Sequence, residues 1–204
     1  MIAIVDYKMG NLASVQSALS LLGTKTVIES DPDKLAGYDK IILPGVGAYG
    51  DAMEHLKQRG MDDAVKAYAQ SGKWMLGICL GMQLLFEKSE EFGSHKGLEL
   101  IPGVVQAFDT KAFNEPLKVP HMGWNKLFAK HHSPLFKGLD ESFYLYFVHS
   151  FHVKTEDKYT IGSTHYGYDF ASAVQKENIL GFQPHPEKSH DNGLKILKNF
   201  IELG

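Results

Sequence analysis

In the first half of the chain, short apolar runs alternate with segments whose apolar residues recur at helical spacing. Four of the runs are predicted as buried strands: 1–5, 25–29, 40–43 and 74–78. Three segments between them are predicted as amphipathic helices: 12–22, 51–59 and 61–70. Asp31-Pro32 supplies a cap with a proline in the first helical turn. Strands that alternate with helices predict an α/β fold with a mainly parallel, doubly wound sheet and helices on both faces.

The second half is rich in short β-type runs, which predict antiparallel strands beside the parallel sheet. Five runs are predicted as strands: 104–108, 123–128, 143–153, 159–163 and 172–175. A last helical stripe predicts a closing helix through Leu194, Leu197, Phe200 and Ile201. With 204 residues, 44% of them apolar, and no repeat or linker, the chain is expected to form one domain, 1–204.

Composition narrows the classes of function. A net charge of -3 without a long charge run argues against a nucleic-acid-binding surface. The single cysteine cannot form an internal disulfide, and no apolar stretch approaches the roughly 20 residues that a membrane-spanning helix needs. The chain passes into a strand pattern from Met1 without a basic leader. We therefore expect a cytoplasmic protein that binds neither nucleic acid nor membrane.

The one cysteine, Cys79, stands between a predicted strand and a predicted helix. Gly77 precedes it by two residues and Gly81 follows it by two. Gly-x-Cys-x-Gly at a strand–helix junction is the thiol form of a nucleophile elbow, a cramped turn that lifts the nucleophile above the sheet edge. The following helix, predicted to run from Leu80 to Glu87, would direct its first amides at the sulfur and favour a thiolate. A small buried hydrophobe is the alternative role for a lone cysteine.

His185 and Glu187 occur late in the chain, on either side of Pro186. A thiol nucleophile needs a base that accepts its proton and returns it to the leaving group, and a carboxylate can orient that base. Pro186 favours an extended backbone at His185, in which the histidine and Glu187 would project to the same side. Alone, the pair also fits a surface loop or part of a metal site. Together with the elbow, it indicates a catalytic triad of Cys79, His185 and Glu187.

These motifs resemble those of the class I, triad-type glutamine amidotransferases, which carry a Gly-x-Cys-x-Gly elbow and a late His-Pro-Glu. A narrower resemblance is to the glutaminase subunits of imidazole glycerol phosphate synthases, and it spans nearly the whole chain. Six segments carry it: 6–12, 44–47, 77–86, 121–125, 146–150 and 181–189. Pro184 departs from the family pattern, which usually has an aromatic residue there. This departure removes no catalytic group. It concerns only the local geometry of the loop behind the base.

The resemblance also implies a glutamine site. The glycines of the run 44–47 let a peptide plane turn over, so Val46 and Gly47 are expected to form an oxyanion hole with the Leu80 amide. An ordinary strand-ending turn is the alternative. Positions that match the family's glutamine contacts are Gln83, Glu91, His149, Ser150 and Phe151. For Gln83 the alternative is a solvent-facing helix residue, and for Glu91 it is one member of an acidic patch.

The reaction implied is hydrolysis of L-glutamine to glutamate and ammonia through a thioester on Cys79, without a metal or an organic cofactor. The remaining histidines, His131 among them, lack metal-ligand spacing. We expect no second domain in these 204 residues that would use the ammonia. The resemblance implies a barrel-shaped cyclase subunit as the partner in a heterodimer, which makes imidazole glycerol phosphate and an aminoimidazole carboxamide ribotide in histidine biosynthesis. Positions expected near the docking face are Asn11, His121, Trp124, Asn125, Tyr146 and Lys188.

Other classes of function stay open at this point. A free-standing cysteine hydrolase or peptidase could share the elbow and the late histidine, and it would act without a partner. A paralogous amidotransferase that feeds another synthase would carry the same glutaminase motifs. A non-catalytic binding module would normally have lost the nucleophile or the base, and this chain retains both.

Overall fold

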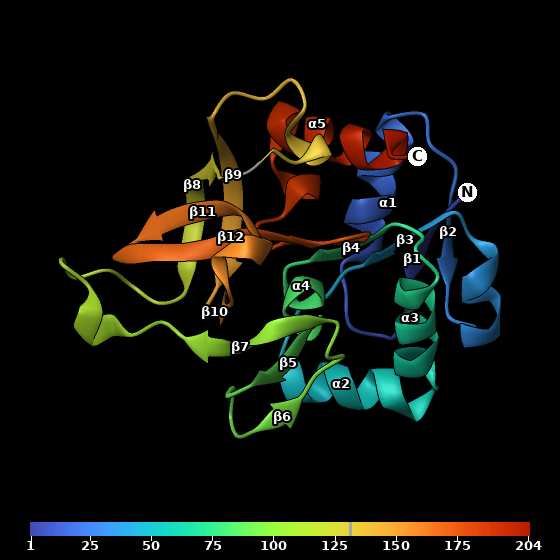
Figure 1. The fold of residues 1–204 in the computed structure, drawn as a ribbon, viewed down its shortest axis with the longest axis horizontal. Coiled ribbons are helices and arrows are strands. Elements are labelled where there is room, and N and C mark those ends of the chain that lie inside the picture. Colours follow the sequence, from blue (N-terminus) through green and yellow to red (C-terminus); the bar gives the residue numbers. More distant parts are fainter. Residues whose placement is uncertain (131) are drawn as a thin grey trace.

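Parallel strands form the centre of the protein in a computed structural model that describes residues 1–130 and 132–204; His131 lies outside the described residues. These strands are β1 (Ile2–Val5), β2 (Thr26–Glu29), β3 (Lys40–Leu43), β4 (Met75–Ile78) and β13 (Ile179–Phe182). They pair in the order β2, β1, β3, β4, β13 (Figure 1). The first four confirm predicted strands. The fifth, β13, was missed because four residues that include Gly181 give no periodic signal.

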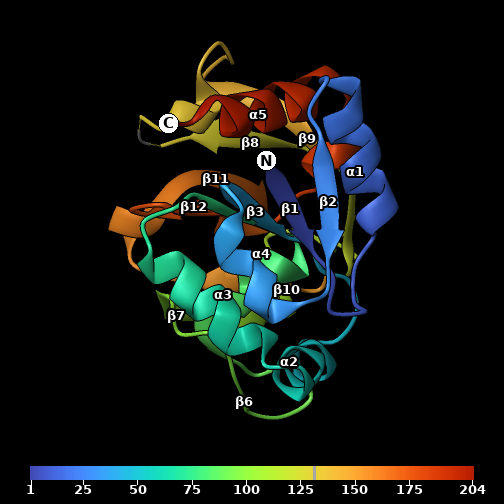
Figure 2. The ribbon, with the colours of Figure 1, turned by 90° about the vertical axis from the view of Figure 1, so that its right-hand side faces the viewer.

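Helices cover both faces of this sheet, as the alternation predicted (Figure 2). The helices on one face are α1 (Leu12–Leu21) and α5 (His190–Glu202). Those on the other are α2 (Tyr49–Gln58), α3 (Met61–Gln70) and α4 (Leu80–Leu84). Successive strand residues point to opposite faces, so Ile2 and Ile4 join the core with α1 and α5, whereas Ala3 and Val5 join the core with α2 and α3.

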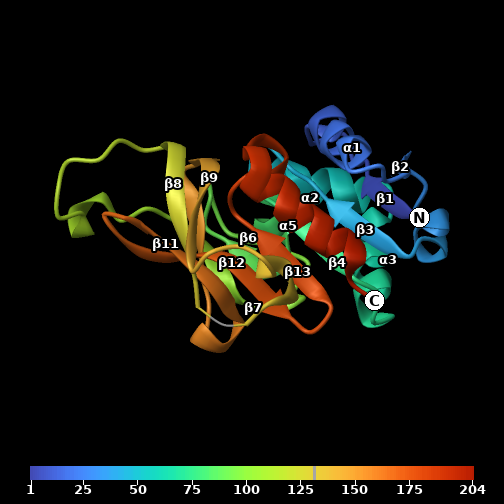
Figure 3. The ribbon, with the colours of Figure 1, turned by 90° about the horizontal axis from the view of Figure 1, so that it is seen from above.

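Mostly antiparallel strands extend the sheet beyond β13. They are β5 (Phe86–Ser89), β6 (His95–Lys96), β7 (Ile101–Ala107), β8 (His121–Ala129), β9 (Ser142–His149), β10 (Phe151–Lys154), β11 (Thr160–Tyr166) and β12 (Tyr168–Lys176). Among them, β5 and β7 form a parallel pair. The sheet divides at β12: one branch continues through β10, β7, β5 and β6, and the other through β11, β8 and β9. Seen from above, β8, β9 and β11 lie to the side of the helices α1 and α5 (Figure 3).

Two sequence predictions in this region are wrong. The helix after Cys79 does not reach Glu87 but ends at Leu84, since Phe86 to Ser89 pairs with β6 and β7 as strand β5. Tertiary pairing overrides the helical spacing of its apolar residues. The predicted strand 143–153 is broken at Ser150, where the chain passes from β9 into β10.

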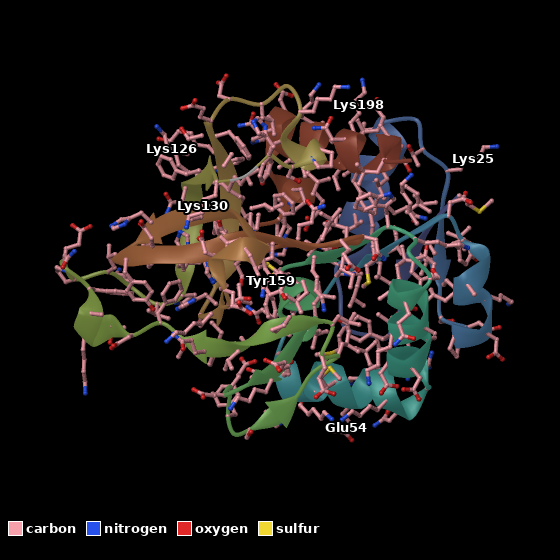
Figure 4. All side chains as sticks on the ribbon, viewed as in Figure 1. Lys25, Glu54, Lys126, Lys130, Tyr159 and Lys198 are labelled. Atoms are coloured by element: carbon pink, nitrogen blue, oxygen red, sulfur yellow. The ribbon has the colours of Figure 1, made fainter. Side chains whose placement is uncertain are left out.

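Charged side chains are spread over the periphery. Lys25, Lys126 and Lys198 project outward at separate points of the molecule (Figure 4). Within the described ranges, no helix is both long and apolar enough to cross a bilayer. The same ranges hold no group of three or more histidine, cysteine or acidic side chains placed to bind a metal ion.

Candidate active site

Cys79 stands at the carboxyl end of β4, immediately before α4. Its backbone has φ = +54°, a value that is rare for a residue with a side chain, and the residue is 8% exposed. The two flanking glycines are required by space. A Cβ on Gly77 would lie 2.7 Å from the Gly81 carbonyl oxygen, and one on Gly81 would overlap the Leu43 carbonyl. The sharp turn predicted from Gly-x-Cys-x-Gly is therefore present.

Strand β13 brings the late histidine to this turn. It pairs in parallel with β4, with Phe182 opposite Ile78, and the Cys79 N–H donates to the Phe182 carbonyl at 2.7 Å. The chain then runs three residues further to His185 at the same edge of the sheet. Ligands bind beyond the carboxyl ends of parallel strands, which is where both side chains lie.

His185 and Glu187 form a buried pair. His185 Nδ1 lies 2.7 Å from Glu187 Oε1, and the two side chains are 3% and 2% exposed. The backbone of His185 is extended, as Pro186 predicted, but residues Pro186–Lys188 then form a 3-10 turn, η5. The two side chains therefore meet across this turn and not along an extended segment. Within the described residues, His185 Nε2 and Glu187 Oε2 have no hydrogen-bond partner. Nε2 of His185 is thus available for proton transfer.

The environment of His185 favours its charged form. Burial lowers its pKa, but Cys79 and Glu187 together outweigh burial and raise the pKa from 6.5 to about 10. The imidazolium form of His185 is thus favoured beside the Cys79 sulfur and the Glu187 carboxylate. It can donate a proton to a leaving amine.

Strand β9 fixes the backbone of the base. The His185 N–H donates to the Tyr146 carbonyl at 2.9 Å. Ser189 Oγ accepts from the Tyr146 N–H at 2.9 Å and donates to the His185 carbonyl at 2.6 Å. Sequence reasoning missed Ser189, since a serine four residues after the base gives no signal of a contact with another strand. These bonds hold the base in place beside Pro184, which is buried.

The segment 44–47 lies against the elbow. A Cβ on Gly45 would lie 2.5 Å from Tyr7 Oη and 2.8 Å from the Gly81 nitrogen, so only glycine fits. Tyr7, which is buried, donates its hydroxyl proton to the Pro44 carbonyl at 2.8 Å. Gly47 has φ = +101°, and Val46 is 43% exposed. The backbone of this segment thus passes directly beside the nucleophile.

A pocket of about 270 Å³ opens above Cys79. This volume lies just below the range typical of drug-sized ligands and suits a ligand the size of an amino acid. Its lining residues are Val46, Gly47, Cys79, Leu80, Gln83, Glu91, Val148, His149, Ser150, Phe151 and His185. The structure therefore gathers every predicted oxyanion and glutamine-binding position into the wall of one cavity, and Val148 is the one lining residue that sequence reasoning missed.

Comparison with known proteins decides the family. A family model described as "Glutamine amidotransferase class-I" matches residues 3–203. The chain belongs to this family. It is 69% identical over 203 residues to the imidazole glycerol phosphate synthase subunit HisH of Sulfurimonas denitrificans, covering 99% of this chain and 98% of the relative. It is 59% identical to the HisH subunit of Wolinella succinogenes, with full coverage of both chains. Within the amidotransferases, the chain therefore belongs to the HisH subunits.

A solved structure shares the fold of this amidotransferase. PurLQS from Thermotoga maritima matches with a TM-score of 0.77 at 20% identity, covering 98% of this chain and 96% of that one. At this identity the structural similarity is evidence for the fold alone. It confirms one α/β domain with a mixed sheet.

Two polar side chains in the wall of the amidotransferase pocket also hold its backbone. Gln83 Nε2 donates to the Phe151 carbonyl and to Gln183 Oε1, each at 3.0 Å. Glu91 Oε2 accepts from the N–H of Tyr49 at 2.7 Å, at the first residue of α2, where no side chain of the preceding residue caps the helix. Gln83 is 5% exposed, so its predicted alternative as a solvent-facing residue is wrong.

Behind His149, a chain of neutral polar groups crosses from β9 to β8. His149 Nε2 lies 2.9 Å from His121 Nδ1, and His121 Nε2 lies 3.2 Å from Asn125 Nδ2. Burial lowers the pKa of His149 to about 3 and that of His121 to about 4. His121 is only 3% exposed, so it lies behind the predicted docking face rather than on it.

The other predicted docking positions are more accessible. Trp124 is 47% exposed and stacks on His190 with ring centroids 5.0 Å apart, so the alternative of a core tryptophan is wrong. Tyr146, opposite Trp124 in the β8–β9 pairing, is partly buried, as is Asn125. Lys188 and Asn11 are exposed; Asn11 also caps α1 by accepting from the Ser14 N–H at 3.3 Å.

Proposed function

We propose that this chain hydrolyses L-glutamine to glutamate and ammonia with Cys79, His185 and Glu187 as its catalytic groups. As a HisH subunit, it serves imidazole glycerol phosphate synthase in histidine biosynthesis. The observation that supports the catalytic assignment is the approach of two distant segments. The elbow cysteine and His185 line one small pocket, and Glu187 holds the His185 ring from behind, so a nucleophile and an oriented base are within reach of one ligand.

The reaction proceeds in two steps. The Cys79 thiolate attacks the side-chain carbonyl carbon of glutamine, and the tetrahedral intermediate expels the amine, which takes a proton from the His185 imidazolium and leaves as ammonia. His185 then accepts a proton from water, which attacks the γ-glutamyl thioester and releases glutamate and the thiolate. Glu187 holds the imidazole through Nδ1 in both steps.

The oxygen of the substrate carbonyl becomes negative in each tetrahedral intermediate. Two backbone amides are assigned to it: that of Leu80, next to the nucleophile, and that of Val46 or Gly47 across the pocket. Gln83 and Glu91, with the stretch from His149 to Phe151, are assigned to the amino-acid end of the substrate. A carboxylate such as Glu91 suits the ammonium group of glutamine.

The ammonia is assigned to a cyclase subunit with a barrel fold, bound as a heterodimer. Trp124 and Tyr146 on the accessible face of β8 and β9 support this, together with Lys188 and Asn11. Strand β9 of this face also contacts the base, because the carbonyl of Tyr146 accepts the N–H of His185. A lone free cysteine that acts as a nucleophile also suits the reducing cytoplasm, where we place the protein.

The test uses the complex of this chain with the cyclase subunit. Cys79→Ala is expected to abolish synthesis driven by glutamine, yet to leave synthesis driven by excess ammonium salt intact, because only the source of ammonia is lost. Loss of both activities would point to a folding or docking defect instead, which the thermal unfolding curve of the variant distinguishes. Glutamine hydrolysis that persists in Cys79→Ala would overturn the assignment.

A further inference from the structure

The carbonyl oxygen of Phe151 accepts two hydrogen bonds at the wall of the pocket. Gln83 Nε2 donates to it at 3.0 Å, and His149 Nδ1 lies 2.8 Å from it. A backbone carbonyl has lone pairs and no proton, so each partner must present an N–H to it. This one acceptor therefore sets the orientation of the Gln83 amide and the tautomer of His149.

The orientation of Gln83 sets that of Gln183. Gln83 Nε2, being the donor to Phe151, directs its second N–H at Gln183 Oε1, 3.0 Å away. Gln183 must then turn its own amide nitrogen in the other direction, where it lies 3.8 Å from Cys79 Sγ. Gln183 has no exposed surface, so water cannot take the place of either partner. An N–H donor is thus directed at the sulfur.

The second partner of the Phe151 carbonyl, His149, is fixed in the same way. His149 donates through Nδ1, so its Nε2 is the acceptor for His121 Nδ1 at 2.9 Å. The remaining nitrogen of His121 accepts from Asn125 Nδ2 at 3.2 Å. Every polar atom of the two rings is satisfied in this one arrangement. Turning the Gln83 amide over would place its oxygen against the Phe151 oxygen and break the network.

We infer that Gln183 is a further catalytic residue, whose amide N–H donates to the sulfur of Cys79 and stabilises the thiolate. The inference rests on the proposed role of Cys79 as the nucleophile. A donor gains more from an ionised acceptor than from a neutral one, so the contact favours the thiolate over the thiol. It acts twice in the reaction: on the thiolate that attacks glutamine, and on the thiolate that leaves the thioester.

The test measures the thiolate directly. Because Cys79 is the single cysteine of the chain, the rate of alkylation by iodoacetamide reports on this sulfur alone. Gln183→Met keeps the length of the side chain and removes the donor. Its alkylation profile, the rate of alkylation as a function of pH, is expected to shift by about one pH unit to higher pH. The kcat/KM for glutamine in the complex is expected to fall about tenfold, with most of the change in kcat.

Two further variants keep the test decisive. Thr164→Val removes a buried hydrogen bond of 2.7 Å to Ser172 without touching the sulfur, and it is expected to leave the alkylation profile unchanged. Gln83→Met frees the Gln183 amide and is expected to shift the profile in the same direction as Gln183→Met; it serves as the test if Gln183→Met does not fold. Alkylation needs no glutamine, so a weaker binding of substrate does not affect it.

If Gln183→Met, or Gln83→Met in its place, folds and its alkylation profile is not shifted, the role of Gln183 is overturned. The role of Cys79 as the nucleophile is not affected by that result. Persistent glutamine hydrolysis in Cys79→Ala would overturn the proposed function itself.

Discussion

At the scale of single residues, burial and pairing act against each other on His185. Burial alone would keep the imidazole neutral, but the Cys79 sulfur and the Glu187 carboxylate favour the imidazolium and raise the pKa to about 10. Below that pH the imidazole is protonated, so at neutral pH His185 carries a positive charge. An acid ready for the leaving amine is therefore present before glutamine arrives.

Imidazole NMR of His185 tests this balance. The carbon and nitrogen shifts of its ring are expected to titrate near pH 10 in the wild-type protein. Cys79→Ala and Glu187→Gln should each lower the pKa, because each removes a group that raises it and leaves the opposing effect of burial. A wild-type pKa at or below 6.5 would contradict the account, since the ring would then be neutral where the enzyme works.

At the scale of the element, the nucleophile turn depends on close approach of backbones. Gly81 lies so near the Leu43 carbonyl that any side chain would collide with β3, and Gly45 fills the gap between Tyr7 and α4. Cys79 itself keeps a positive φ between them. The rarely populated backbone conformation of a non-glycine residue is held here by strands on both sides.

Gly81→Ala is therefore expected to lower the free energy of unfolding by about 2–4 kcal/mol, the cost typical of severe overpacking. Urea unfolding followed by circular dichroism measures it. Gly37→Ala, where no atom lies within 4 Å of the added Cβ, serves as the control and should stay within about 0.5 kcal/mol of wild type. Equal stability of the two variants would show that the turn tolerates a side chain.

Much of the fold follows from local pattern, because its first strands and helices carry their own periodicity and caps. Met61–Gln70 begins and ends where the spacing of its apolar residues predicts. Strands β13 and β5 do not follow from local pattern, because both are short and are formed by pairing with strands that are distant in sequence. The residues proposed as the triad could be selected from motif chemistry. Gln183 and Ser189 could not, because only the fold brings them against Cys79 and against β9.

At the scale of the whole molecule, the accessible face of the β8–β9 hairpin adjoins the catalytic pocket. Met122 and Trp124 are exposed on β8, and Tyr144 is exposed on β9. A group of exposed large apolar side chains of this kind is typical of a surface that binds another protein. The opposite partner of Met122 is Val148, which lines the pocket. A subunit that docks on this face would cover the mouth of the site and contact the strand that holds His185.

This placement leads us to expect a poor glutaminase in isolation. The backbone between Gly45 and Gly47 can turn the Val46 amide toward the substrate oxygen or away from it, and one missing oxyanion donor costs about 10²–10³ in rate. We expect the partner with its ligand to favour the competent orientation. Steady-state rates of the chain alone and of the liganded complex should differ by about that factor. Equal rates would leave this gating without support and favour a free-standing hydrolase.

We propose that glutamine is cleaved through a thioester on Cys79. The most direct measurement is mass spectrometry of the complex, quenched in acid during turnover with glutamine and digested to peptides. We predict a γ-glutamyl group on the peptide that contains Cys79, present only while glutamine is being consumed and absent from the Cys79→Ala protein. Rapid turnover with an unmodified Cys79, or with the glutamyl group on another residue, would contradict the account.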